Sequence, residues 1–298
     1  METAIGGCAR ATRSGSARRM EYPMIETGQT YLVMGLLDPD SLAYAIGQTI
    51  EALGGKVVYT VQNEVFKRRF LDHNDAMPAA VREALDFRFC DATKEGEVRK
   101  LFDELGPVRG IVHAIAFANP RTCLGEEFHT EATADILMSH HISCVSLATV
   151  LRHAQSNLAG GGSVVALTFD TTHVYPFYNW MGVQKAALEA LVRALARRHG
   201  RDLIRVNAVS AGPLFTKAAS KIPGFGGLTH VWNESSPLPW DGRADKQAVA
   251  DAVAFLLGNR SLKITGQVLT VDGGASIIGG PLQDFERPTT TDSFESGK

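Results

Sequence analysis

The sequence is poor in cysteine, in net charge and in long apolar runs. Its four cysteines are far apart and form no C-x-x-C pair, so we expect free thiols in a reducing compartment. Thirty Lys and Arg residues balance 32 Asp and Glu residues, which argues against a nucleic-acid partner. No apolar run is long enough to predict a membrane span, and no histidine pair has the spacing of a metal site.

The two ends of the chain differ in composition from the rest. Residues 1–27 predict a disordered leader, because the first 20 residues hold four arginines, several small polar residues and one acid. An Arg-rich and Ser-rich leader also resembles an organelle transit segment, and Met20 and Met24 are alternative starts. We expect a cytoplasmic protein, with organelle import left open. Residues 281–298 are polar and aperiodic, which predicts a mobile tail.

Between these ends, short apolar runs alternate with longer amphipathic segments. We expect strands near 31–35, 56–61, 87–90, 110–115, 163–169, 203–209 and 264–271. Helices are expected near 41–53, 95–105, 133–157, 178–199 and 245–258. This alternation predicts an α/β fold with a single Rossmann-like, doubly wound parallel sheet of about seven strands and helices on both faces. No repeat or linker divides 28–280, so we expect one domain there.

The first expected strand runs into a turn that suits a nucleotide phosphate. Gly35 ends the strand and lets the backbone approach a pyrophosphate, while Ser41 stands at the start of the next helix, where the dipole favours anions. The G-x-G-x-x-G fingerprint is absent. The alternative is therefore a tight turn in which Ser41 or Asp40 serves only as the N-cap.

The end of the second strand carries amides where a dinucleotide fold commonly has an acid. Gln62 can bond to a free ribose 2′-hydroxyl, which favours NADH. Lys67, Arg68 and Arg69 follow and could instead meet the 2′-phosphate of NADPH. The alternative is that these three cations form a solvated helix face.

Tyr178 and Lys185 are seven residues apart, about two turns of an α-helix, which predicts that both side chains leave one face. A phenol beside a fixed ammonium can stabilise an oxyanion that forms during hydride transfer. The alternative is a core tyrosine and a surface lysine on an ordinary amphipathic helix.

Six motifs in order resemble one known family. They are Gly35-x5-Ser41-Leu-Ala, Val61-Gln62-Asn63, His113-Ala-Ile-Ala-Phe117, Tyr178-Asn-Trp-Met-Gly182-x-x-Lys185, Asn207-Ala-Val-Ser-Ala-Gly-Pro213-Leu-Phe-Thr216 and Val271-Asp-Gly-Gly274. Over about 28–280 the chain is similar to the NAD(P)H-dependent enoyl-acyl-carrier-protein reductases of type II fatty acid synthesis, a divergent branch of the short-chain dehydrogenase/reductases. The Tyr-x6-Lys spacing is the sharpest feature, because ordinary members of the superfamily have Tyr-x3-Lys.

The resemblance implies reduction of the trans-2 double bond of an enoyl thioester, the last step of fatty acid elongation, with NADH or possibly NADPH. Its partner would be acyl carrier protein, and homotetramers are common in the family. The implied catalytic residues are Tyr178, Lys185 and Phe169, the last at a position where the family commonly has a second tyrosine. The implied cofactor-binding residues are Gly35, Ser41, Leu42, Gln62, Asp91, Ala92, Ala114, Ile115, Lys185, Leu214 and Thr216.

The same resemblance implies a substrate-binding lid over residues 217–240, which is rich in glycine and apolar residues. The expected substrate contacts are Phe117, Met181, Phe225 and Trp232. Two rival functions stay open. A generic short-chain carbonyl reductase would have Lys at position 182, where this chain has Gly182, and a silent nucleotide sensor would have lost Tyr178 or Lys185. The length of the preferred acyl chain stays open as well.

Overall fold

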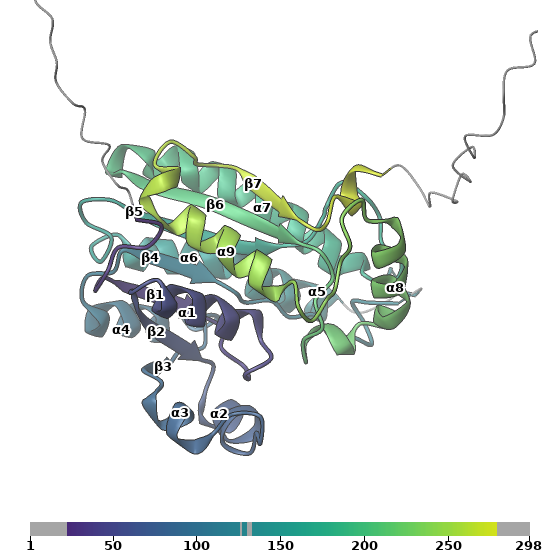
Figure 1. The fold of residues 1–298 in the computed structure, drawn as a ribbon, viewed down its shortest axis with the longest axis horizontal. Helices are drawn as coiled ribbons and strands as arrows, with labels where there is room; N and C mark the ends of the chain where they lie inside the picture. Colours follow the sequence, from purple (N-terminus) through teal and green to yellow (C-terminus); the bar gives the residue numbers. More distant parts are fainter. Residues whose placement is uncertain (1–22, 126, 130–132, 279–298) are drawn as a thin grey trace, which may run out of the picture.

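The computed structural model describes residues 23–125, 127–129 and 133–278 (Figure 1). The predicted tail and most of the predicted leader lie outside the described residues. Residues 23–27 lie at the end of the predicted leader, and they pack against the body of the protein. Ile25 is buried in the core, and Glu26 forms an ion pair with Arg109 at 2.7 Å. The packed part of the chain therefore begins a few residues earlier than the expected boundary.

Seven parallel strands form one sheet, as the sequence predicts. The strands are β1 (Thr30–Met34), β2 (Lys56–Val61), β3 (Phe87–Phe89), β4 (Gly110–His113), β5 (Gly162–Thr168), β6 (Ile204–Ala211) and β7 (Val268–Val271). Their order in the sheet is β3-β2-β1-β4-β5-β6-β7, and each neighbouring pair is parallel. The order reverses between β1 and β4. In such sheets ligands bind at the carboxyl ends of the strands beside this reversal.

Helices cover both faces of the sheet, and each face has its own core (Figure 1). On one face α1 (Leu42–Ala52) packs against α9 (Lys246–Leu257). On the other face lie α4 (Glu95–Leu105), α6 (Ser146–Ala154) and α7 (Asn179–His199). Successive side chains of a strand point to opposite faces, so Tyr31 and Val33 enter the first core while Leu32 and Met34 enter the second.

Several elements differ from the prediction. The expected helix 133–157 is a continuous helical stretch of α5 (Thr133–His140), a π-helical turn (His141–Val145) and α6. Between β2 and β3 the sequence offered only the alternative of a helix face at residues 67–69. The chain forms α2 (Glu64–Lys67), a second π-helical turn (Arg68–Asp72) and α3 (Ala79–Ala84) there. The segment 217–240 contains a short 3₁₀ helix (Ala219–Lys221) and α8 (Phe225–Ser235).

The stretch Thr133–Ala154 is long and apolar enough to cross a membrane by length and composition alone. The prediction from the sequence missed this property because it considered only uninterrupted apolar runs. Nearly half of the apolar window is buried inside the protein. Leu147, Val150 and Leu151 of α6 are fully buried in the second core. The apolar character of the stretch Thr133–Ala154 therefore reflects its packing against the sheet. The three cysteines in the described part of the chain, Cys90, Cys123 and Cys144, are free and buried.

Candidate active site

The turn after β1 brings the backbone of two strands into close contact. Gly35 has φ +96°, and a Cβ at this position would lie 2.4 Å from the carbonyl oxygen of Ala114. The glycine is therefore required by the approach of the loop after β4. Ser41 is the N-cap of α1, since its Oγ accepts a hydrogen bond from the Tyr44 amide at 3.3 Å. Leu42 begins the helix, and no acid occupies its first turn, so its positive end stays available to an anion.

The ends of β2 and β3 bring Gln62, Asp91 and Ala92 together. The Gln62 amide donates to a carboxylate oxygen of Asp91 at 3.4 Å. Burial opposes ionisation of Asp91, but hydrogen bonds from Thr93 and Gln62 outweigh it and lower the pKa of this carboxyl. Ala92 is buried beside it. The result is an amide next to an anionic carboxylate, a pair suited to ribose hydroxyls.

The loop after β4 carries Ala114, Ile115 and Phe117. The Phe117 backbone is held by serines of the neighbouring helix: its amide donates to Ser143 Oγ at 3.0 Å, and its carbonyl accepts from Ser139 Oγ at 2.9 Å. The Phe117 ring itself is exposed. The strand ends at His113, so Ala114 and Ile115 belong to the loop at the carboxyl edge of the sheet, the edge at which Gly35 ends β1.

His113 is the last residue of β4. It is fully buried, and burial lowers its pKa to about 3, so the imidazole is neutral. Ser146 Oγ donates to the Ile142 carbonyl at 2.7 Å and lies 2.8 Å from His113 Nε2. Because the serine proton is already used, Nε2 carries the imidazole proton and donates it to Ser146. Nδ1 is then a buried acceptor without a partner among the residues described.

Lys185 is 6% exposed on α7. Its Nζ donates a hydrogen bond to the carbonyl oxygen of Leu167 in β5 at 2.8 Å. Burial lowers the pKa of Lys185 to about 8, partly opposed by the nearby Glu189 carboxylate. The alternative of a surface lysine is therefore wrong. An almost fully buried ammonium at the end of a strand is a functional-site feature.

Tyr178 does not lie within the helix, as the two-turn argument assumed. The helix begins at Asn179, and Tyr178 is its N-cap, between Phe177 and Asn179, which both have positive φ. The ring still lies over the first turn, because a Cβ on Gly182 would be 3.6 Å from Tyr178 Cδ1. Burial raises the pKa of Tyr178, so the phenol is protonated. Its hydroxyl has no hydrogen-bond partner in the part of the chain that the structure describes.

An aromatic cluster surrounds Tyr178. The Phe169 ring centroid lies 5.0 Å from that of Tyr178, 4.9 Å from Tyr175 and 5.6 Å from Trp232. Tyr175 donates its hydroxyl hydrogen bond to Asp170 at 2.6 Å. The prediction from the sequence did not assign Tyr175 or Asp170 to the site. Both residues lie close to Tyr178 in the sequence, and this could have pointed to them. The sequence pattern does not show, however, which way the Tyr175 ring faces.

Trp232 brings α8 onto this cluster. Trp232 is 4% exposed, and its indole Nε1 donates to the carbonyl oxygen of Asp272 at 2.9 Å. Phe169 contacts both Tyr178 and Trp232, and the Met181 amide donates to the Tyr178 carbonyl at 2.9 Å. Phe225 instead packs edge-on against Phe215 at 5.5 Å, and the Phe117 ring stays exposed. Met181 is buried in the first turns of α7.

The turn after β6 joins the sheet to the segment 217–240. Leu214 is buried, and Thr216 Oγ1 accepts a hydrogen bond from the Ala219 amide at 3.1 Å. A Cβ on Gly212 would lie 2.7 Å from the Trp240 ring, so the Ala-Gly-Pro turn needs its glycine for this packing. Trp240 in turn donates its indole N–H to Pro213 at 3.0 Å.

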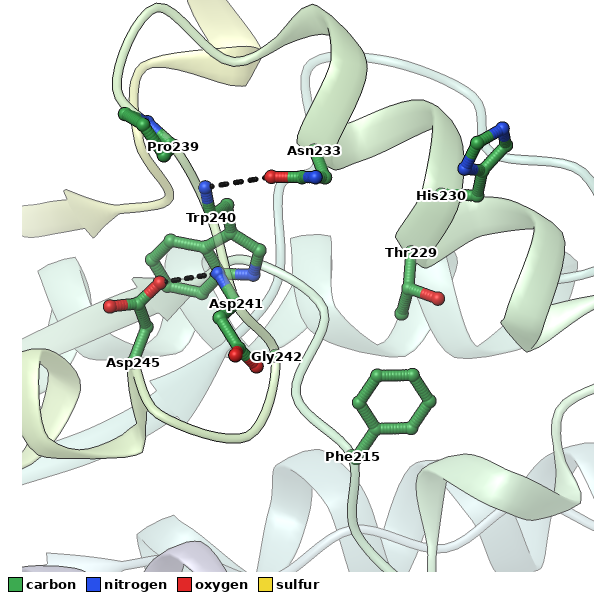
Figure 2. A pocket seen from close by; sticks show the side chains of 9 residues that line it. All are labelled: Phe215, Thr229, His230, Asn233, Pro239, Trp240, Asp241, Gly242 and Asp245. Carbon is green, nitrogen blue, oxygen red and sulfur yellow. Dashed lines mark hydrogen bonds between the residues drawn. The ribbon is translucent and has the colours of Figure 1, made fainter.

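Two cavities flank these elements. One of about 450 Å³ lies between α8 and the turn before α9, and Figure 2 shows Thr229, His230 and Asn233 of α8 on one side, with Trp240 and Phe215 around it. Neither Tyr178 nor Lys185 lines it. A second cavity of about 400 Å³ at the end of β2 includes Gln62 and Phe89. Among residues 23–125, 127–129 and 133–278, no group of three His, Cys, Asp or Glu side chains could hold a metal.

Comparison with known proteins agrees with this geometry. A family model described as enoyl-(acyl carrier protein) reductase matches residues 35–276. The enoyl-acyl-carrier-protein reductase (NADH) FabI of Bacillus subtilis is 34% identical over 261 residues, which cover 84% of this chain and 96% of the relative. The enoyl-acyl-carrier-protein reductase (NADPH) FabI of Staphylococcus aureus MRSA252 is 33% identical over 253 residues, covering 84% and 97%.

Solved structures give the same result. The crystal structure of the Anaplasma phagocytophilum enoyl-acyl-carrier-protein reductase in complex with NAD matches with a TM-score of 0.78 at 32% identity, covering 88% of this chain and 98% of that one. The Bacillus cereus enzyme with NADP+ and indole naphthyridinone matches with a TM-score of 0.75 at 32% identity, covering 85% and 98%. This chain therefore belongs to the enoyl-acyl-carrier-protein reductase family of nicotinamide-dependent oxidoreductases.

Proposed function

We propose that this protein reduces the trans-2 double bond of enoyl-acyl-carrier-protein thioesters with NADH, the last step of the fatty acid elongation cycle. The observations that carry the proposal lie at the carboxyl end of β5, where Lys185 bonds to the Leu167 carbonyl oxygen and the Phe169 ring packs on Tyr178. Lys185 is held there by Leu167, and the Tyr178 phenol, at the N-cap of the same helix, has no hydrogen-bond partner among the residues that the structure describes. Family membership supports the same reading.

Each group has a role in this reaction. A bound reduced nicotinamide would supply the hydride for the β-carbon of the thioester. Tyr178 donates its O–H to the carbonyl oxygen as negative charge develops there, and burial keeps this proton on the phenol until it is needed. Lys185 positions the nicotinamide ribose and adds positive charge near the forming enolate. Protonation of the α-carbon completes the saturation.

The residues at the carboxyl ends of β1, β2, β3 and β4 fit a dinucleotide. We propose that the pyrophosphate lies at the first turn of α1, with Gly35, Ser41 and Leu42 around it. Gln62 and Asp91 would bond the adenosine ribose, with Ala92 beside the adenine. Ala114 and Ile115 would line the cofactor along the loop after β4. Leu214 and Thr216, after the Ala-Gly-Pro turn, would contact its nicotinamide half.

We propose NADH as the preferred cofactor over NADPH. Two of the three cations that could meet a 2′-phosphate are already paired, Lys67 with Asp72 at 2.8 Å and Arg68 with Glu64 at 2.5 Å. The carboxylate of Asp91 lies beside Gln62 and would repel a phosphate. Arg69 lies against the Phe70 ring. This arrangement neutralises most of the positive charge at the ribose end.

The segment 217–240 is proposed as the substrate lid. Phe225 and Trp232 would be its apolar contacts with the acyl chain, joined by Met181 from α7 and Phe117 from the loop after β4. The docking of Trp232 on Phe169 and Asp272 supports this role, because it places lid side chains directly over the ring that packs on Tyr178.

We also propose a cytoplasmic homo-oligomer, with a tetramer as the specific expectation. Large apolar side chains stay exposed on α5, α7 and the π-helical turn between α5 and α6, namely Leu137, Met138, Val145 and Val183. Exposed apolar groups on adjoining helices are typical of a subunit interface. Light scattering of Val183→Glu should show a smaller assembly than the wild type. The matched change Val65→Glu, on exposed α2, should leave the assembly intact, and a monomeric wild type would contradict the proposal.

The activity is tested by following NADH consumption with crotonyl thioester and with a panel of ketones and aldehydes. We expect rapid oxidation with the enoyl thioester and little with the carbonyl compounds. The reverse pattern would favour a generic short-chain carbonyl reductase, although position 182, where such an enzyme would carry its lysine, is glycine.

A further inference from the structure

The loop between β1 and α1 contains two aspartates, and each lies beside a lysine from the C-terminal half of the chain. Lys217 Nζ lies 3.6 Å from Asp38 Oδ2. Lys246 Nζ donates to the Asp40 carbonyl oxygen at 2.7 Å and lies 4.0 Å from its carboxylate. Acids in a loop that receives a dianionic pyrophosphate are unfavourable unless cations compensate them.

Burial and hydrogen bonds hold Asp38 in place within the loop between β1 and α1. It is 2% exposed, its Oδ1 accepts a hydrogen bond from the Asp40 amide at 3.1 Å, and its carbonyl accepts one from Ser41 Oγ at 2.7 Å. Burial raises the pKa of Asp38, and Lys217 opposes this rise. Lys217 lies beside the Asp38 carboxylate, and the Asp38 backbone carbonyl bonds to Ser41, the N-cap of α1. This contact brings the lysine charge to the loop that holds the proposed pyrophosphate position.

Lys217 itself is held in place and yet open to a ligand. Its Nζ lies 5.2 Å from the centroid of the Phe70 ring, which comes from the π-helical turn after α2. Its side chain is 47% exposed, so the ammonium has hydrogen bonds left to donate. Lysine binds phosphate as a point charge and needs no second side chain to do so. Lys217 also directly follows Thr216 and opens the lid segment 217–240.

We propose that Lys217 is a further cofactor-binding residue, which neutralises Asp38, contacts the pyrophosphate and thereby ties the start of the lid to the bound dinucleotide. The inference rests on the proposed function for the identity of the dinucleotide, the position of its pyrophosphate and the lid segment 217–240. Because the lid begins at this residue, a contact made by Lys217 to the cofactor fixes the lid at its first position. Cofactor binding then favours the lid conformation that the acyl thioester needs.

The test is calorimetric binding of NADH and of ADP, which has the pyrophosphate and lacks the nicotinamide. Lys217→Met keeps the apolar stem over Phe70 and removes the charge. It should weaken both ligands about tenfold, the scale of one charged hydrogen bond. The affinity of this variant should also fall less steeply with salt than that of the wild type. Lys217→Arg should bind almost as the wild type does, and Asp38→Asn in the Lys217→Met background should restore part of the loss.

The matched control is Lys263→Met, an exposed lysine near the amino end of β7, which should bind both ligands as the wild type does. Unchanged ADP affinity in Lys217→Met would overturn the proposal, as would equal losses in the control. If Lys217→Met does not fold, Lys217→Gln provides the same charge removal. A wild type that binds ADP through Lys217 but does not reduce enoyl thioesters would contradict the proposed function and leave this inference intact.

Discussion

The Nζ of Lys185 in helix α7 donates a hydrogen bond of 2.8 Å to the carbonyl oxygen of Leu167, close to the carboxyl end of strand β5. This bond fixes an almost fully buried ammonium at Leu167, and the Phe169 ring, which follows β5 directly, packs on Tyr178. The charge has no carboxylate in direct contact among the described residues. A buried cation held only by a carbonyl costs stability, and its presence at the end of a strand indicates that function retains it.

Replacing Lys185 should therefore raise the stability of the folded protein while lowering its activity. In the absence of cofactor, Lys185→Met should raise the melting temperature at pH 7 by a few degrees, on the order of 1 kcal/mol of relieved desolvation. The same variant should lose enoyl reduction. Differential scanning calorimetry and steady-state kinetics check both parts. A lower melting temperature together with retained turnover would contradict this account of the residue.

The same charge predicts a pH dependence. The pKa of Lys185 in the folded protein is lowered to about 8, below its value of roughly 10.4 in an unfolded chain. The unfolded state therefore binds more protons between these values, so the free energy of unfolding should rise as the pH increases from about 8 toward 10. Activity should fall over the same range, because the ammonium loses its proton. A pH profile of kcat/KM without a decline above about 8 would argue against a charged Lys185 in catalysis.

Tyr178→Phe should lower kcat by roughly 10²–10³, the usual effect of removing one oxyanion donor. The ring contacts with Phe169 are kept, so NADH affinity and the melting temperature should change little. Single-turnover kinetics and NADH titration measure the two effects. As a control, Tyr175→Phe removes a hydroxyl that bonds to Asp170 and should reduce kcat much less. Turnover at the wild-type level in Tyr178→Phe would remove the tyrosine from the mechanism.

The ion pair between Glu64 and Arg68 gives a prediction for cofactor choice. Glu64→Gln releases the guanidinium from its carboxylate, so the kcat/KM with NADPH should rise several-fold, the scale expected of a partly exposed charge. The value with NADH should stay within about twofold. Asp202→Asn is a suitable control, because it frees Arg198 at the end of α7, outside the lining of the second cavity. An equal change with both cofactors would show that these cations do not face the ribose.

Trp232 gives a prediction for the lid. Trp232→Phe keeps an aromatic ring against Phe169 but leaves the Asp272 carbonyl without its donor, at a cost of about 1–2 kcal/mol to lid docking. Limited proteolysis should then cut 217–240 faster, and the KM for the thioester should rise. Val231→Ala, on the exposed side of the same helix, should not change the cleavage rate. If proteolysis cut residues 217–240 at the same rate in both variants, Trp232 would not be what holds the lid.

The sheet was predictable because its strands are short apolar runs with clear limits. Lys56–Val61 was predicted to the residue, since its β-branched side chains are bounded by Gly55 and Gln62. The last strand begins at Val268 and not at Ile264, because Asn207 binds the Ile264 carbonyl and Gly266 turns with φ +73°. Such a bond between residues far apart in sequence leaves no local pattern.

The candidate site was predictable through its motif and less so through its geometry. The spacing of Tyr178 and Lys185 identified the pair, but positive φ values at Phe177 and Asn179 place the tyrosine before the helix. The contacts of Trp232 with Phe169 and of Lys217 with Asp38 join segments far apart in the chain. Only the fold brings such partners together, so no periodicity or spacing could show them.

The central claim is that the buried lysine and the free phenol serve carbon–carbon double-bond reduction. It is tested most directly by incubating the wild-type protein with NADH and a trans-2-enoyl thioester and identifying the product by mass spectrometry. The account predicts the saturated acyl thioester, formed in amounts equal to the NADH consumed and nearly absent with Tyr178→Phe. Conversion of a ketone to an alcohol, with the enoyl thioester left unchanged, would contradict it.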